Sequence, residues 1–158
     1  MENSPRGQVP AITTAAETNT TTDEWSRRCH PACLVCGGSR RDGLALRFEC
    51  QADGSVSAEF ECREAFQGYP DRLHGGVIAM LLDAAMTHCL FARNIAGLTA
   101  KLSIRYQRAV RLGTLAVVRA RIVDGQSPLF YLQAEMIQDG KVCAAARGTF
   151  WDSRQAES

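Results

Sequence analysis

The sequence lacks the long hydrophobic segments that carry a protein into or across a membrane. Its longest uninterrupted apolar run covers residues 77–82, whereas a membrane-spanning helix needs roughly 20 apolar residues. The N-terminal segment also has no apolar core of signal-peptide length. We therefore expect a cytoplasmic protein with no membrane partner.

The chain also has no excess of charge of either sign. Its 18 basic residues nearly balance its 17 acidic residues, which gives a formal net charge of +1. Such a balance offers no electrostatic case for nucleic acid, and the sequence has no helix-turn-helix segment or basic region. We expect no nucleic-acid partner.

Common cofactor and nucleophile motifs are missing as well. The sequence contains no P-loop, no dinucleotide-binding glycine fingerprint and no Gly-x-Ser-x-Gly elbow. The sequence therefore gives no support for a function that uses NAD or ATP, and we expect no cofactor.

The cysteines do not form the pattern of a disulfide scaffold, because their number is odd, at seven, and no secretion signal precedes them. Cys33 and Cys36 form a CxxC pair with Cys29 and His30 nearby, which suggests zinc. A structural zinc site needs four converging ligands, normally from two separated pairs, and no second pair follows. We interpret the segment as a short ordered loop with incidental thiols, and we expect no metal.

A chain of 158 residues is long enough for one domain with a sizeable core. Residues 1–24 contain almost no large apolar side chains, so we expect this segment to be disordered. Residues 25–152 form the single domain, and the polar tail 153–158 is expected to be frayed.

Alternating apolar residues predict strands at 44–50 and 56–62, joined by an Asp53-Gly54 hairpin turn. A helix follows, to about residue 93. Four further strands are predicted at 99–109, 115–123, 129–138 and 141–151. One long apolar helix and one sheet predict an α+β fold in which an antiparallel sheet of about six strands wraps around the central helix.

This helix is apolar on nearly every side, yet it contains one carboxylate, Asp83. Burying an unpaired carboxylate is costly, so Asp83 is a candidate general base or nucleophile. Thr87 lies one turn later on the same face, and Met80 and Gly76 share that stripe. The alternative is a structural carboxylate that backbone amides or an arginine satisfy.

The helix begins at His74-Gly75-Gly76. Amides in the first turn have no acceptor within the helix, and the helix dipole is positive there, so Gly75 and Gly76 can polarise a carbonyl. The alternative is a tight turn. His74 is either a general acid or base or, more simply, an orienting residue, and His88 is interpreted as a core or interface histidine.

A basic run of Lys101, Arg105, Arg108 and Arg111 lies on and after the strand at 99–109. Arginine forks suit phosphates, so these arginines are the candidates for binding a nucleotide-tailed ligand. The alternative is a solvated strand face.

Four segments carry a resemblance to a known family: Phe66-Gln67-Gly68-Tyr69, His74-Gly75-Gly76, Leu82-Asp83, and 99–106. With an acid nine positions after the His and this order of strands, residues 30–151 resemble the hotdog-fold thioesterases. The branch that they resemble most is the phenylacetate-degradation (PaaI-like) acyl-CoA thioesterases. The resemblance implies hydrolysis of acyl-CoA without metal or cofactor.

The resemblance also implies roles for individual residues. Asp83 corresponds to the catalytic carboxylate, and Gly75 to the glycine whose amide polarises the thioester carbonyl. His74 corresponds to a positioning residue, while Thr87 and Thr99 correspond to hydroxyl residues near the acid and the water. Candidate pocket residues are Phe66, Tyr69, Met80 and Phe91.

One position departs from the family pattern. Relatives often carry Asn or Gln six positions before the His, to hold the lytic water or the carbonyl. Here that residue is Gly68, and the amide is next to it at Gln67. Either the loop shifts so that Gln67 substitutes, or the site lacks this contact.

Gly75 and Asp83 are roughly 12 Å apart along the helix axis, at 1.5 Å per residue. A carbonyl held at Gly75 is therefore out of reach of a water held by Asp83 of the same chain. A homodimer with antiparallel helices would build two shared sites, and the family forms such dimers, often paired into homotetramers. Two other functions stay open: a hotdog enoyl-CoA hydratase or dehydratase, and a non-catalytic acyl-CoA binding protein.

Overall fold

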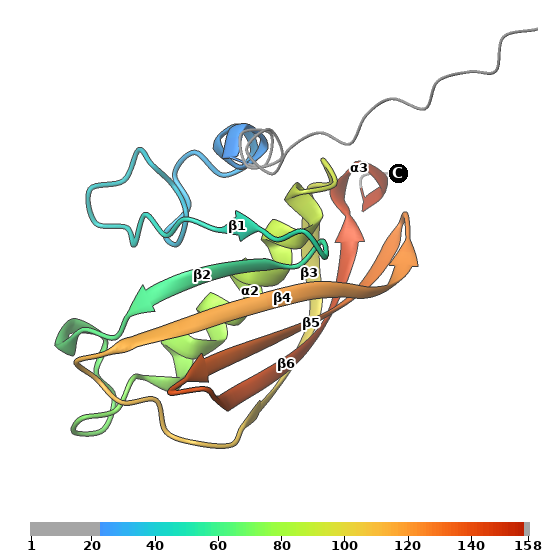
Figure 1. Cartoon of the computed structure of the whole chain (residues 1–158). Helices are drawn as coiled ribbons and strands as arrows, with labels where there is room; N and C mark the ends of the chain where they lie inside the picture. The colour runs from blue at the N-terminus through green and yellow to red at the C-terminus, as the bar shows by residue number, and fades with distance from the viewer. Residues whose placement is uncertain (1–22, 157–158) are drawn as a thin grey trace, which may run out of the picture.

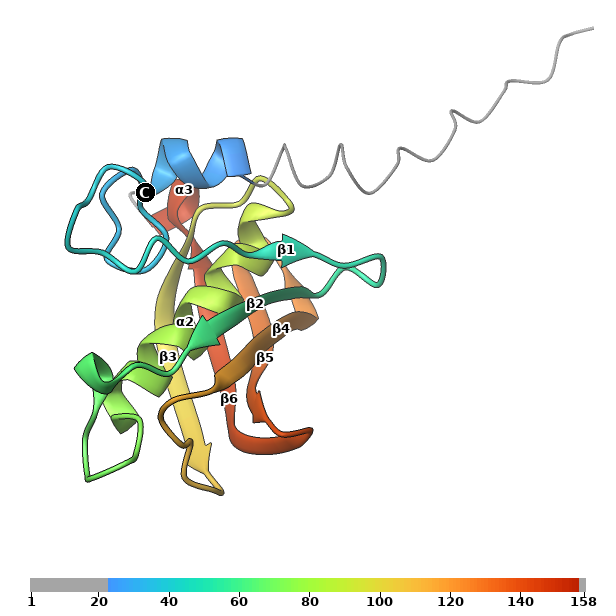
Figure 2. The same cartoon turned by 60° about the vertical axis from the view of Figure 1, so that its left-hand side comes forward.

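The computed structural model describes residues 23–156 and shows one sheet that curves around one long helix (Figures 1 and 2). The six strands lie in the order β1-β2-β4-β5-β6-β3, and every neighbouring pair is antiparallel. The α+β fold predicted from the sequence is confirmed. In chain order, the elements are β1 (Glu49–Cys50), β2 (Val56–Glu61), η1 (Glu64–Phe66), α2 (Gly75–Phe91), β3 (Gly97–Tyr106), β4 (Leu115–Gln126), β5 (Leu129–Gln138), β6 (Lys141–Asp152) and α3 (Ser153–Ala156).

Helix α2 occupies the hollow of the sheet and contacts strands β2 to β6. Its Ala, Leu and Met residues favour helix, and its second half is buried almost continuously from Leu81 to Phe91, apart from Asp83 and Ala84. The helix ends at Phe91, two residues before the predicted end, and Asn94 then takes a positive φ of 56°. The chain therefore turns back directly into β3.

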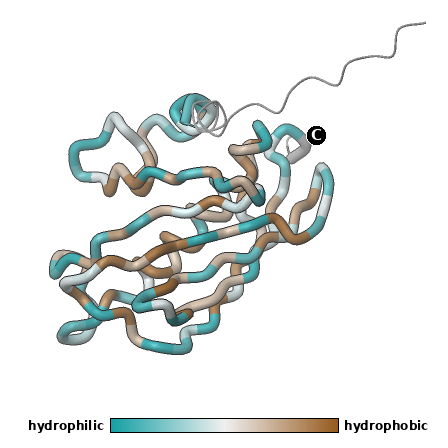
Figure 3. Tube along the Cα trace, viewed as in Figure 1, coloured by the Kyte–Doolittle hydropathy of each residue, from teal (hydrophilic) through white to brown (hydrophobic). Residues whose placement is uncertain are grey.

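The strands present alternate residues to the helix, as their period of two requires. On β5, Phe130, Leu132, Ala134 and Met136 are buried between more exposed neighbours. In Figure 3, hydrophobic and hydrophilic residues likewise follow one another along the strands. One face of the sheet thus forms the core with α2, and the other face meets solvent.

The first predicted strand is the largest difference between expectation and structure. Of residues 44–50, only Glu49 and Cys50 form a strand. Ala45 has a positive φ of 48°, which breaks the extended backbone. The amides of Leu44 and Leu46 instead donate to the carbonyls of Leu34 and Val35, each at 2.8 Å. This stretch therefore pairs with the preceding loop and not with the sheet.

We call residues 23–48 the N-terminal arm. It starts with a helix over 23–29 and continues as an irregular loop that packs on the second half of α2 (Figure 2). The ring of His30 meets Phe91 edge-on at 4.9 Å, and Phe48 stacks on His88 at 4.2 Å. Val35 and Phe48 are buried in the core. The arm is thus an integral layer over the helix.

The structure describes only part of each of the two predicted terminal segments. The segment expected to be disordered, 1–24, lies outside the described residues except for Asp23 and Glu24, which are helical. The tail expected to be frayed begins with the short helix α3. No helix among the described residues is both long and apolar enough to cross a membrane.

Candidate active site

His74 caps the N-terminus of α2. Its Nδ1 accepts a 2.9 Å hydrogen bond from the amide of Gly76, which places the ring proton on Nε2. A Cβ on Gly76 would stand 3.0 Å from that Nδ1, so a larger residue there would press against the capping ring. His74 is therefore engaged as an orienting residue, and its free nitrogen is a donor.

The next residue, Gly75, offers an amide without a partner. The Tyr106 hydroxyl donates a 2.8 Å hydrogen bond to the Gly75 carbonyl oxygen and so ties the helix entrance to β3. Among residues 23–156, no acceptor meets the N–H of Gly75. A free amide at the positive end of a helix dipole can stabilise charge on a carbonyl oxygen. The sequence had not singled out Tyr106 as a site residue.

Asp83 is half-buried near the middle of α2. Its Oδ1 accepts a 2.7 Å hydrogen bond from the Thr99 hydroxyl, and no ion pair to Asp83 occurs within the described residues. Thr87 is buried and donates to the backbone carbonyl of Asp83 at 3.1 Å. Thr99 therefore contacts the carboxylate, whereas Thr87 does not.

A β-bulge explains why Thr99 faces Asp83. On an ideal strand, Thr99 would point away from the face that carries Leu102, Ile104 and Tyr106. The pairing of β3 with β6 shifts register between Thr99 and Lys101, so one extra residue is accommodated there. The bulge turns Thr99 towards the helix.

His30, from the N-terminal arm, lies within electrostatic reach of Asp83. Burial lowers the pKa of His30, and the negative charge of Asp83 opposes that shift. Nearby, burial lowers the pKa of His88 to about 3, with a further contribution from His30. We expected His30 to belong only to a loop with incidental thiols, because sequence spacing gives no sign that the arm reaches α2.

The loop before the helix explains the departure at position 68. A Cβ on Gly68 would stand 3.1 Å from the Cα and 3.3 Å from the Cδ2 of His74, so a larger side chain does not fit in this conformation. The side chain of the neighbouring Gln67 accepts a 3.0 Å hydrogen bond from the amide of Asp71. In this structure, Gln67 thus shapes the loop.

The candidate pocket residues occupy different environments. Phe66 is half-buried and packs on Phe60 with the ring centroids 5.4 Å apart. Met80 is partly buried against the core, and Phe91 is fully buried. The side chain of Tyr69 is 84% exposed. Within one chain, the four residues do not form a common pocket wall.

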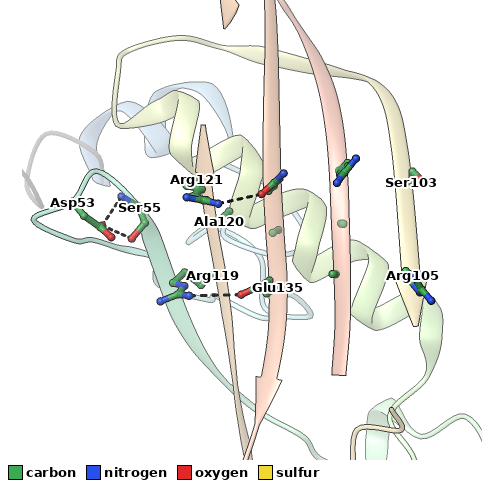
Figure 4. Close-up of a pocket in the computed structure, with 13 residues that line it drawn as sticks. Asp53, Ser55, Ser103, Arg105, Arg119, Ala120, Arg121 and Glu135 are labelled. Carbon is green, nitrogen blue, oxygen red and sulfur yellow. Dashed lines mark hydrogen bonds and ion pairs between the residues drawn. The ribbon is translucent and has the colours of Figure 1, made fainter. Parts of the chain in front are cut away.

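The arginines do not form one anion site. Arg105 lies in a groove on the face of the sheet opposite α2, across the strands from Arg119 and Arg121 (Figure 4). Arg108 donates to the carbonyl of Val142 at 2.8 Å, and Arg111 forms a 2.5 Å ion pair with Asp139. The backbone of Arg111 pairs with Arg72, near the helix entrance.

Comparisons with known proteins fit this architecture. A family model described as the thioesterase superfamily matches residues 71–145. No curated protein sequence shows significant similarity to the chain. A crystal structure of a thioesterase superfamily protein is similar with a TM-score of 0.69 and 29% identity, over 74% of this chain and 61% of the other. The match thus spans less than two thirds of that protein.

Two further crystal structures are similar to the chain. A hypothetical thioesterase from Streptococcus pneumoniae TIGR4, solved with coenzyme A, has a TM-score of 0.64 and 20% identity over 68% of this chain and 88% of the other. A mutant of the phenylacetic acid degradation protein PaaI from Thermus thermophilus has a TM-score of 0.62 and 23% identity over 67% and 91%. The predicted hotdog fold is confirmed.

Proposed function

We propose that the chain is a member of the thioesterase superfamily, whose family model matches residues 71–145, and that it hydrolyses acyl-CoA thioesters to a free acid and coenzyme A. The observation that supports this proposal most is the environment of the Asp83 carboxylate. Its carboxylate is half-buried on the central helix, is held by Thr99 and has no ion-pair partner in residues 23–156. A carboxylate in such a position is suited to acid–base or nucleophilic chemistry.

In the proposed reaction, the Gly75 amide binds the oxygen of the thioester carbonyl and stabilises the charge that develops there. Asp83 removes a proton from a water molecule, whose oxygen attacks the carbonyl carbon. The C–S bond then breaks, and the coenzyme A thiolate leaves and is protonated. The alternative is direct attack by Asp83, which forms an anhydride that water hydrolyses.

We propose that each site is shared by two chains in a homodimer. Gly75 and Asp83 of one helix are roughly 12 Å apart at 1.5 Å per residue, too far to act on one carbonyl. Strand β3 is an edge strand that pairs only with β6 within the described sheet. It also exposes 56% of Leu98 and 52% of Tyr106. A second copy seated at this edge would cover these side chains and bring its own helix beside Asp83.

Acyl-CoA is proposed as the substrate because the similar thioesterase from S. pneumoniae was solved with coenzyme A. The hydratase alternative is weaker, since His74 uses Nδ1 to cap the helix and has only a donor nitrogen left. The other alternative, an acyl-CoA binding protein without turnover, is distinguished by the test below.

The test offers purified protein a panel of acyl- and aryl-CoAs, with detection of free thiol and of water addition to enoyl-CoA. We expect thiol release by the wild type and a loss of about 10²- to 10⁴-fold in kcat for Asp83→Asn, as for removal of a general base. Glu59→Gln, an exposed acid on β2, is the matched control and should behave as the wild type. Hydration of enoyl-CoA or saturable binding without turnover would contradict the proposal, as would full activity of Asp83→Asn.

A further inference from the structure

The N-terminal arm contains a cluster of three metal-ligand side chains outside the proposed catalytic groups. His30, Cys33 and Cys36 each offer one ligand atom, and these atoms all lie within 4.8 Å of one another. All three residues are at least half-buried. The sequence shows only a CxxC pair with a nearby histidine, whereas the structure brings the three donors together.

The spacing of the donors is close to that of a tetrahedral zinc site. Zn–S bonds of 2.3 Å and Zn–N bonds of 2.0–2.1 Å place neighbouring ligand atoms about 3.6–3.8 Å apart. The distance from His30 Nδ1 to Cys36 Sγ is 3.8 Å. The remaining distances need to contract by at most about 1 Å to close the site, which side-chain rotations can supply.

The turn around the two cysteines is built tightly. The amide of Gly37 donates to the carbonyl of Cys33 at 2.9 Å. A Cβ on Gly37 would lie 2.4 Å from the Cys33 nitrogen, so no other residue fits. The Ser26 hydroxyl, from the preceding helix, donates to Cys36 Sγ at 3.7 Å, as groups around metal-bound thiolates commonly do. The Gly37 turn and the Ser26 hydrogen bond together fix the orientation of the two thiols.

A second observation is a buried histidine near the cluster whose ring nitrogens have no hydrogen-bond partner among the described residues. His88 is 4% exposed, and both of its ring nitrogens are buried without a hydrogen-bond partner among the described residues. Buried polar groups normally have a partner, and exceptions often mark a water or an ion. His30 and His88 both pack edge-on against Phe91, at 4.9 and 5.1 Å. A cation or its bound water beside His30 could give this ring a partner.

We propose that His30, Cys33 and Cys36 supply three of the four ligands of a zinc ion, with a water molecule as the fourth, and that this ion fixes the N-terminal arm onto helix α2. Thiolate and imidazole ligands favour zinc over magnesium or calcium, which prefer oxygen. Residues 30–48 have no helix or strand, and irregular loops of this length are uncommon in compact domains unless something holds them. The ion has a structural role, and it holds His30 in place near Asp83.

The test measures metal in the full-length protein after expression with added zinc and removal of free metal. We expect about one zinc per chain by elemental mass spectrometry, and its loss in Cys33→Ser and in Cys36→Ser. Cys29→Ser is the matched control, because Cys29 lies outside the converging set, and it should keep its zinc. Asp83→Asn should also keep it, so this result does not depend on the proposed hydrolysis.

A second measurement does not depend on any variant. Wild-type protein stripped by a chelator should bind one equivalent of Co²⁺ with a thiolate-to-cobalt charge-transfer band. Its midpoint of thermal unfolding should rise when Zn²⁺ is added and stay unchanged with Mg²⁺. Protein without zinc and without the cobalt band would overturn the proposal, as would a Cys33–Cys36 disulfide whose reduced form takes up no metal.

Discussion

The Thr99 hydroxyl donates a 2.7 Å hydrogen bond to the Asp83 carboxylate, and this bond joins edge strand β3 to the centre of helix α2. It exists because the bulge between Thr99 and Lys101 reverses the face that Thr99 presents. The bond leaves one oxygen of Asp83 for a water molecule or a thioester carbon. Thr99 is therefore a positioning residue for the proposed base.

Replacing Thr99 should impair turnover more than binding. Hydrogen bonds to charged groups contribute about 1.5–3 kcal/mol, so Thr99→Val should lower kcat about 10- to 100-fold while KM changes little. Thr99→Ser keeps the hydroxyl and should retain most of the activity. Steady-state kinetics of the three proteins check this prediction, and equal values of kcat for Thr99→Val and Thr99→Ser would contradict it.

The two helix-entrance glycines should differ in their tolerance of a methyl group. A Cβ on Gly76 meets His74 Nδ1 at 3.0 Å and would displace the cap, whereas a Cβ on Gly75 meets the Tyr106 ring at an ordinary 3.6 Å. Gly76→Ala should lower the free energy of unfolding by about 0.5–2 kcal/mol, as for loss of a helix cap. Gly75→Ala should be neutral or stabilising. Urea unfolding of both variants tests the difference, and equal stabilities would refute it.

The carboxylate at the end of β6 should make stability depend on pH in the acid range. Asp152 is 1% exposed and accepts hydrogen bonds from the Arg154 guanidinium, at 3.0 and 2.8 Å, and from Ser127. The bond to Arg154 contributes most to lowering the pKa of Asp152 from its ordinary 3.8 to about 2. The folded state thus prefers the ionised form. This stabilisation is complete above about pH 4 and is lost as the pH falls towards 2.

Asp152→Asn removes that titration. The wild type should be more stable than the variant at neutral pH, and the gap should narrow between pH 4 and pH 2. Denaturant unfolding of both proteins across this range measures the difference in their free energies of unfolding. The other carboxylates are the same in both proteins, so their titration cancels in this difference. A gap that stays constant down to pH 2 would contradict the assignment.

Most of the fold follows from the periodicity of the sequence. The strands from β2 to β6 alternate over most of their length, and the helix is mostly apolar, so the order of these elements along the chain and their approximate bounds are predictable. The strand predicted at 44–50 fails because Ala45 adopts a positive φ and the segment pairs with Leu34 and Val35. Such pairing within an irregular arm leaves no periodic signal in the sequence.

The candidate site is predictable where it depends on one helix and not where it depends on contacts between elements. Asp83, Gly75 and His74 follow from a carboxylate in an apolar helix and from a His-Gly-Gly entrance. The spacing of Thr87 from Asp83 suggests a contact with the carboxylate, but its hydroxyl bonds to the backbone instead. A run of arginines suggests one phosphate site, yet Arg105 and Arg111 lie on different parts of the surface. Positions of this kind are set by the folded sheet.

The sharpest test of a shared site uses Gly75→Pro. The substitution removes only the N–H that the proposal uses, because proline is favoured at the first position of a helix and His74 before it is already extended, with ψ of 132°. Alone, Gly75→Pro should lose about 10²- to 10³-fold in kcat, as for removal of one oxyanion donor. Gly75→Ala, which keeps the N–H, should stay active.

The central claim is that Gly75 of one chain works with Asp83 of another. Co-expression of Gly75→Pro and Asp83→Asn chains should give mixed dimers in which one of the two sites has both groups intact. Random pairing makes half of the dimers mixed, so the co-expressed protein should recover about a quarter of wild-type acyl-CoA hydrolysis, although each variant alone is nearly inactive. If the mixed dimers form and hydrolysis stays at the level of the single variants, the shared site is contradicted.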